Sequence, residues 1–201
     1  MIRILYFTFV LLTLSVTAFA GDIEVVNLNS YFEDDLQNWQ LVLSNAAEAE
    51  AIIDDSDSIK GGQCVYIDIK KLGTGSGFWE IRFAQLSVTG NQGDQYTISV
   101  WAKADGGPRQ IRPHWRFATV NAQTFDITDE WAEYSFTFVA NGTTADLDIA
   151  LGATMGNLWL DNFRLYEGPY EEDPDLGRIE EKIAVNSVGK LAVTWAKVKT
   201  Q

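Results

Sequence analysis

The sequence predicts an all-β protein, an antiparallel β-sandwich of the jelly-roll type with a short C-terminal tail. Many short segments alternate apolar and polar residues with a period of two, which is the pattern of strands with one buried face. Clusters of Gly, Asn, Asp and Pro separate these segments and mark turns. No amphipathic helix of useful length precedes the tail. Roughly ten short strands with regular turns are typical of a sandwich.

The first twenty residues are predicted to be a signal peptide. Arg3 supplies a positive n-region, residues 4–14 form an almost unbroken apolar run, and an A-x-A cleavage site ends at Ala20. The run is shorter than the ~20 residues that a bilayer span needs. We therefore expect a mature chain that begins at Gly21, is secreted to the extracellular space or the periplasm, and has no transmembrane segment.

The predicted strands follow one another along residues 21–168. Alternation is sharpest at 64–69, 96–102, 131–139 and 146–151, where the last segment keeps its leucines and isoleucine on one face. Shorter or less regular apolar segments predict the remaining strands, at 23–27, 40–43, 49–53, 79–88, 110–117, 124–127 and 158–166.

The composition changes after Gly168. Residues 169–175 are acidic and carry two prolines, which indicates a linker, and residues 176–201 are too few to build a core. We expect one β-sandwich domain at 21–168, followed at 169–201 by an acidic linker and a tail, for which a helix, an added strand and a disordered segment are the alternatives.

Charge and cysteine content exclude several classes of protein. The formal charge of −13 argues against nucleic acid or an anionic membrane as a partner. Cys64 is the only cysteine, so no intrachain disulfide can form, and we expect it to be a small strand residue, with a reactive thiol as the alternative. A monomer held together by its core or by a metal is expected.

Short signatures recur along the chain in a characteristic order. With these signatures residues 23–167 resemble the carbohydrate-binding modules of families four, nine and twenty-two, which implies a galactose-binding-domain-like jelly roll with sugar bound on a concave sheet. The signatures are Asn29-Ser30-Tyr31-Phe32-Glu33, Trp39, Lys60-Gly61-Gly62, Phe78-Trp79-Glu80-Ile81-Arg82, residues 95–103, residues 131–138 and Asp161-Asn162-Phe163-Arg164-Leu165.

The resemblance also implies a structural calcium ion away from the sugar. Its ligands would be Glu33, the backbone near Lys60, and Asp161, with Asn29 as a further candidate. Oxygen ligands suit this hard cation, and a metal joining the two chain ends would replace a disulfide. The alternative is that Glu33 and Asp161 only hydrogen-bond to turns.

Sugar binding needs an exposed aromatic ring for stacking and flat polar groups for hydrogen bonds. Trp79 follows the glycine-rich loop at 73–77, and in the modules that this chain resembles a matching tryptophan stacks on sugar. The alternative is that Trp79 packs in the core with Ile81 and Phe83.

A second polar stripe lies in residues 110–117. If Ile111, Pro113, Trp115 and Phe117 face the core, the alternate residues line the ligand face beside the strand that begins at Trp79. The predicted ligand-binding residues are Trp79, Glu80, Arg82, Arg112, His114 and Arg116.

The arginines raise the hypothesis of an anionic glycan, because guanidinium groups bind carboxylate and sulfate through paired hydrogen bonds. The alternative is that they pair with Asp146 and Asp148 and leave the face nearly neutral. Ala150 stands where related modules often place a hydrogen-bonding residue, so one contact with sugar is expected to be missing.

The sequence offers no comparable case for an enzyme. His114 is the only histidine, which excludes a three-histidine zinc site, and neither H-E-x-x-H nor G-x-S-x-G occurs. We therefore expect a non-catalytic polysaccharide- or oligosaccharide-binding module. The alternative is a structural or protein-interaction domain of an exported assembly, which burial of both Trp79 and Trp115 would favour. Trp39, Trp101 and Trp131 are expected in the core, and the face of Trp159 is left open.

Overall fold

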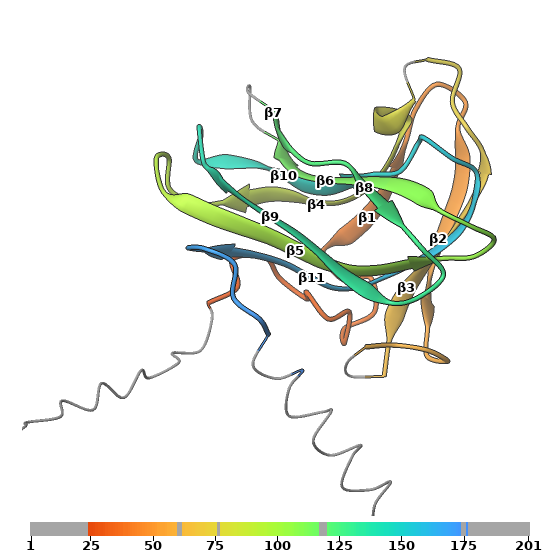
Figure 1. Ribbon diagram of the computed structural model, residues 1–201. Coiled ribbons are helices and arrows are strands. Elements are labelled where there is room, and N and C mark those ends of the chain that lie inside the picture. The colour runs from red at the N-terminus through yellow and green to blue at the C-terminus, as the bar shows by residue number, and fades with distance from the viewer. Residues whose placement is uncertain (1–23, 60–61, 76, 117–119, 174–175, 177–201) are drawn as a thin grey trace, which may run out of the picture.

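The computed structural model describes residues 24–59, 62–75, 77–116, 120–173 and 176. Two antiparallel sheets pack face to face (Figure 1), which confirms the predicted all-β sandwich. The predicted signal peptide, Lys60 and most of the C-terminal tail lie outside the described residues. Within the described ranges, no helix is both long and apolar enough to cross a membrane.

Sheet I runs in the order β1-β4-β10-β6-β7, and β8 pairs with β6 as well. Sheet II runs in the order β2-β3-β11-β5-β9. The strands of sheet I are β1 (Trp39–Leu43), β4 (Ile81–Thr89), β6 (Arg109–Arg116), β7 (Val120–Ala122), β8 (Phe125–Ile127) and β10 (Thr144–Ala150). Those of sheet II are β2 (Glu48–Asp54), β3 (Cys64–Lys71), β5 (Gln95–Ala104), β9 (Ala132–Val139) and β11 (Gly156–Glu167).

The structure differs from the predicted strands at three places. Residues 78–80 form a short 3-10 turn, η1, in front of β4, because Gly77 takes a positive φ of 88° that turns the chain before the strand begins. The predicted strand at 23–27 is represented by one bridge, between Val25 and Tyr166. The three-residue β7 was not predicted, since so short a segment carries no period.

The core lies between the sheets and is rich in aromatic rings. The ring of Trp39 stacks on Phe83 and Phe163 at centroid distances of 5.2 and 5.1 Å. Trp39 and Trp115 are buried, and the placement predicted for Trp39 is confirmed. The same prediction is wrong for Trp101 and Trp131, which are partly exposed, because their parity on sheet II points away from the core.

Cys64 lies in β3, which confirms the predicted strand residue, and its side chain is buried. Burial, with smaller contributions from Asp161 and Asp54, raises the pKa of its thiol from 9.0 to about 12. The folded chain thus keeps a proton that the unfolded chain loses above pH 9. The contribution of this thiol to stability is complete below pH 9 and is lost as the pH rises towards 12.

The acidic segment after Gly168 packs against the sandwich as far as Asp173. The carboxylate of Asp173 is buried and accepts hydrogen bonds from Tyr31 at 2.5 Å and from the Asn162 amide at 2.9 Å. Tyr170 donates to Glu133 at 2.8 Å. The domain boundary predicted at 168 stays a prediction.

Candidate functional site

The alternation of β6 separates a core face from an outer face. Ile111 and Trp115 are fully buried between the sheets, so Arg112, His114 and Arg116 point to the outside of sheet I. We call their surroundings the polar face. It consists of Arg82 from β4, Arg112, His114 and Arg116 from β6, and Asp146 and Asp148 from β10.

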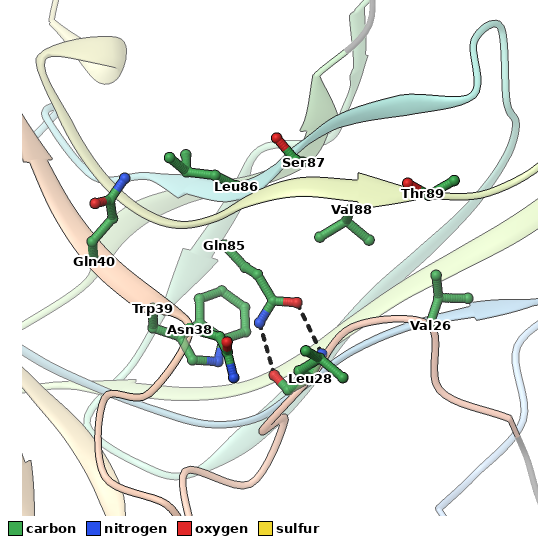
Figure 2. A pocket seen from close by; sticks show the side chains of 10 residues that line it. All are labelled: Val26, Leu28, Asn38, Trp39, Gln40, Gln85, Leu86, Ser87, Val88 and Thr89. Atoms are coloured by element: carbon green, nitrogen blue, oxygen red, sulfur yellow. Dashed lines mark hydrogen bonds between the residues drawn. The ribbon is translucent and has the colours of Figure 1, made fainter.

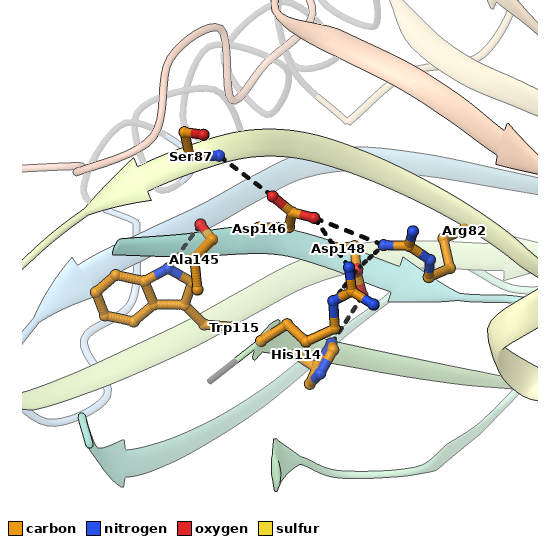
Figure 3. Close-up of polar contacts among 8 residues, drawn as sticks. Arg82, Ser87, His114, Trp115, Ala145, Asp146 and Asp148 are labelled. Carbon is orange, nitrogen blue, oxygen red and sulfur yellow. Dashed lines mark hydrogen bonds and ion pairs between the residues drawn. The ribbon is translucent and has the colours of Figure 1, made fainter. Parts of the chain in front are cut away.

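Asp148 is the centre of the polar face, because β10 lies between β4 and β6 (Figure 3). Its side chain is 0% exposed. One oxygen accepts a hydrogen bond from the guanidinium of Arg82 at 2.7 Å, and the other lies 2.7 Å from Nδ1 of His114. His114 is itself only 2% exposed. The carboxylate therefore joins three strands through two contacts.

Asp146 forms the more exposed part of the same network (Figure 3). It accepts a hydrogen bond from Arg116 at 3.1 Å and lies 3.9 Å from Arg82. The predicted alternative, in which arginines pair with Asp146 and Asp148, is thus what the structure contains. Three arginines against two aspartates leave a single net positive charge on the polar face. No ion pair of Arg112 occurs among the described residues.

Trp79 lies over this network from the η1 turn. Its ring centroid is 4.7 Å from that of His114, and the Arg112 guanidinium carbon lies 5.1 Å from the centroid of the indole. The ring centroid of Phe78, the preceding residue, lies 5.9 Å from the same guanidinium carbon. Trp79 is partly exposed. The predicted alternative of core packing is therefore wrong.

Glu80 is the predicted ligand residue that the structure places elsewhere. It is 2% exposed, and one carboxylate oxygen accepts a hydrogen bond from the Asn45 amide at 2.7 Å. A Cβ atom at Gly73 or Gly75 would come within 2.3 Å of this carboxylate, so the glycine-rich loop closes around it. We correct the prediction accordingly: Glu80 holds the loop that carries Trp79 and does not line the face.

The two carboxylates predicted to bind calcium differ in their surroundings. Asp161 is fully buried, and its two oxygens accept hydrogen bonds from the backbone N–H groups of Ile59 and Asn162, at 2.7 and 2.6 Å. Glu33 is exposed, and Lys60 lies outside the described residues. Among the residues with described positions, no group of three or more His, Cys, Asp or Glu could hold a metal.

A pocket of about 560 Å³ opens at the edge of sheet I (Figure 2). It exists because β1 pairs with β4 only as far as Gln85, and no other strand of the described residues pairs with residues 86–89 on that side. The Gln85 amide holds the backbone of Leu28 through two hydrogen bonds, of 2.9 and 2.8 Å. Gln40 and Leu86 connect this pocket to the outer face of sheet I.

Sequence reasoning missed the central role of Asp148. The signal was present, since Asp146 and Asp148 alternate with buried Leu147 and Ile149 and so must share one face. The pocket at Leu86 gave no such signal, because single exposed leucines are ordinary on protein surfaces.

The chain can be placed among known proteins by its sequence and by its fold. A family model described as a carbohydrate binding domain matches residues 26–155. No protein of curated function gives a significant match to the sequence.

Solved structures share the fold over most of the chain. One described as "CBM4 structure and function" is 25% identical, has a TM-score of 0.55, and is matched over 71% of this chain and 99% of its own. The CBM22-1 xylan-binding domain of Paenibacillus barcinonensis Xyn10C is 15% identical, with a TM-score of 0.53 and coverage of 76% and 100%. TmCBM61 in complex with β-1,4-galactotriose is 12% identical, with a TM-score of 0.53 and coverage of 72% and 99%. The last two likenesses show the fold alone.

Proposed function

This chain belongs to the carbohydrate-binding domain family that matches residues 26–155, and we propose that it binds a polysaccharide or oligosaccharide on the polar face of sheet I. Trp79 is the stacking ring in this proposal. The flat polar groups around it are supplied or supported by Arg112, His114, Arg82 and Arg116.

The observation that carries the proposal is the position of Trp79. The ring is partly exposed above an open sheet, and contacts with His114 and Arg112 hold it in place. A ring that is fixed before binding loses little conformational entropy when sugar stacks on it. Sugar C–H groups pack on such a ring while neighbouring donors reach the hydroxyl groups.

The charge balance supports an uncharged glycan in preference to an anionic one. The carboxylates of Asp146 and Asp148 already occupy Arg82 and Arg116, so neither guanidinium is free for a sulfate or uronate group. An anionic ligand at Arg82 would have to break a pair that is almost fully buried, which is costly, whereas the Arg116 pair is exposed and weaker. Arg112 remains available to bind a hydroxyl or ring oxygen.

Affinity electrophoresis of the mature protein tests the proposal. We expect retardation in gels that contain a neutral polysaccharide, from a panel of β-glucan, xylan, galactan and mannan, and little change of mobility with alginate or sulfated galactan. The variants Arg112→Ala and Arg116→Ala should not lose more retardation in the anionic gels than in the neutral gels. Strong retardation by the anionic gels alone, lost in Arg112→Ala, would instead establish an anionic glycan. No retardation by any gel would contradict the proposal.

The structural alternative predicts burial of both Trp79 and Trp115. Trp115 is buried, but Trp79 is not, so this observation favours a binding face. Carbohydrate-binding domains are binding modules without a catalytic role of their own, and we propose the same for this chain. Export to the extracellular space or the periplasm, directed by residues 1–20, and a monomeric state complete the proposal.

A structural calcium ion bound at Asp161 remains part of the proposal. Asp161 is a fully buried carboxylate on β11, and carboxylate oxygens are the ligands that this hard cation prefers. Calcium bound only to the folded state would stabilise it by mass action.

We expect EDTA to lower the midpoint of thermal unfolding by several degrees, and added calcium to restore it. The variant Asp161→Asn should respond to neither addition. If Glu33 is a ligand, Glu33→Gln should weaken the response of the midpoint to EDTA and calcium. If Asp161 binds calcium with other oxygens, Glu33→Gln should leave that response unchanged. A midpoint that is independent of both EDTA and calcium would contradict the calcium proposal.

A further inference from the structure

The outer face of sheet II carries a row of aromatic side chains far from Trp79 in the fold. In the strand register, Ile52 of β2, Tyr66 of β3, Trp159 of β11 and Lys103 of β5 lie opposite one another. Their neighbours on the other parity, such as Val65 and Leu160, are fully buried, so the row points outward. Four adjacent strands give it a length of ~15 Å.

The rings of this row are close together and partly exposed. Tyr66 and Trp159 have ring centroids 5.2 Å apart, and Trp131 precedes β9 at the end of the row. All three aromatic residues have intermediate exposure, while Ile52 is 46% exposed. We call Tyr66, Trp131 and Trp159 the aromatic platform.

Polar contacts fix the two indoles of the platform. Trp159 donates from Nε1 to Asp54 at 2.8 Å, and Trp131 donates from Nε1 to Asp57 at 3.2 Å. The Lys103 ammonium pairs with Asp57 and lies 4.7 and 5.2 Å from the ring centroids of Trp159 and Trp131. The rings are therefore held by their edges and by one shared cation, and binding would not have to order them.

The charges around the platform select the kind of ligand. Hydrogen bonds lower the pKa of both anchoring carboxylates, chiefly from Ser56 in the case of Asp54 and from Lys103 in the case of Asp57. Both groups thus stay ionised and accept hydrogen bonds from hydroxyl groups. Among the charged residues near the row, Glu50, Asp54, Asp57, Asp68 and Asp105 oppose Lys70 and Lys103, which gives a net negative charge. Repulsion disfavours sulfated or uronate chains.

We propose that the aromatic platform is a second glycan-binding site, on the sheet opposite the polar face, for an uncharged polysaccharide. It takes its ligand class from the proposed function but uses none of the same residues. Two sites on opposite sheets would let one protein hold two polysaccharide chains, or one chain at two places, and gain retention by avidity.

Affinity electrophoresis with variants of the full chain tests the second site, in gels with neutral β-glucan, xylan, galactan or mannan. We expect Trp79→Ala to keep measurable retardation on at least one gel, and Trp79→Ala/Trp159→Ala to lose it. Trp159→Phe keeps a ring and should retain most of the retardation. Val139→Ala is the matched control, since Val139 is an exposed residue at the other end of the same sheet, on β9.

The outcomes separate the two sites. Complete loss of retardation in Trp79→Ala alone, with a folded protein, would overturn the second site and leave the proposed function intact. Equal retardation of Trp79→Ala with and without Trp159→Ala would also overturn it. If Trp79→Ala has no effect and Trp159→Ala abolishes retardation, the platform is the main site and the polar face is not. Absence of retardation in the wild type overturns both.

A second readout does not depend on stability. In ¹⁵N-labelled Trp79→Ala protein, titration with xylohexaose and cellohexaose should shift the indole N–H signals of Trp131 and Trp159 and leave that of buried Trp39 unchanged. Binding that shifts neither platform indole would contradict the assignment.

Discussion

Asp148→Ala is expected to lower the free energy of unfolding by about 3–5 kcal/mol, because it removes one partner of a buried ion pair. The carboxylate is fully buried between Arg82, whose side chain is 12% exposed, and His114. Without it, Arg82 keeps a charge that is largely desolvated, and Nδ1 of His114 loses its partner. Urea denaturation at neutral pH measures the change, read from the midpoint at constant slope.

Asp146→Ala is the matched control on the same strand. Asp146 is 24% exposed and its partner Arg116 is 44% exposed, so solvent screens the pair and its removal should cost only about 0–1 kcal/mol. Equal destabilisation by the two variants would show that burial of Asp148 does not decide its importance. The comparison also tells whether the polar face is a rigid structure or a set of independent surface pairs.

Trp79→Ala is expected to weaken glycan binding at the polar face at least ~30-fold, since a stacking ring at the centre of a site contributes about 2 kcal/mol or more. The ring is partly exposed and lies outside the core, so the variant should unfold close to the wild-type midpoint. Titration calorimetry with the oligosaccharide of the most strongly retarding polysaccharide measures the loss.

Two variants separate stacking from other effects of the Trp79 substitution. Trp79→Phe keeps a ring over His114 and should recover much of the affinity. Phe78→Ala removes the neighbouring ring beside Arg112 but leaves the indole, and should cost less. Unchanged affinity in Trp79→Ala would place glycan recognition elsewhere, with the aromatic platform of sheet II as the next candidate.

The polar face has a further consequence for specificity. Its arginines come from β4 and β6, but the two aspartates of β10 between them cancel most of the charge. Selection among neutral glycans would then depend on shape around Trp79 and on the hydroxyl contacts of Arg112. Ala150 lies between Arg82 and Arg112 in the strand register and is fully buried.

Much of the fold was predictable from local pattern. Alternation placed Leu147 and Ile149 in the core and Arg112 and His114 outside it, because successive side chains of a strand point to opposite faces. The same reasoning failed at Trp101 and Trp131. Large aromatic residues were expected in the core, but their parity on sheet II turns them outward.

The sequence by itself determined the strands, the turns between them and the two faces of each strand, since these depend on neighbours along the chain. Only the tertiary structure decided which strands are adjacent. Arg82 and Asp148 are 66 positions apart, and Trp159 and Asp54 are 105 positions apart. Sheet order and register brought each pair together. They turned a row of arginines into a nearly neutral face, buried Glu80 beneath its loop, and assembled the aromatic platform, because pairing between distant strands is set by packing of the whole core and not by any local pattern.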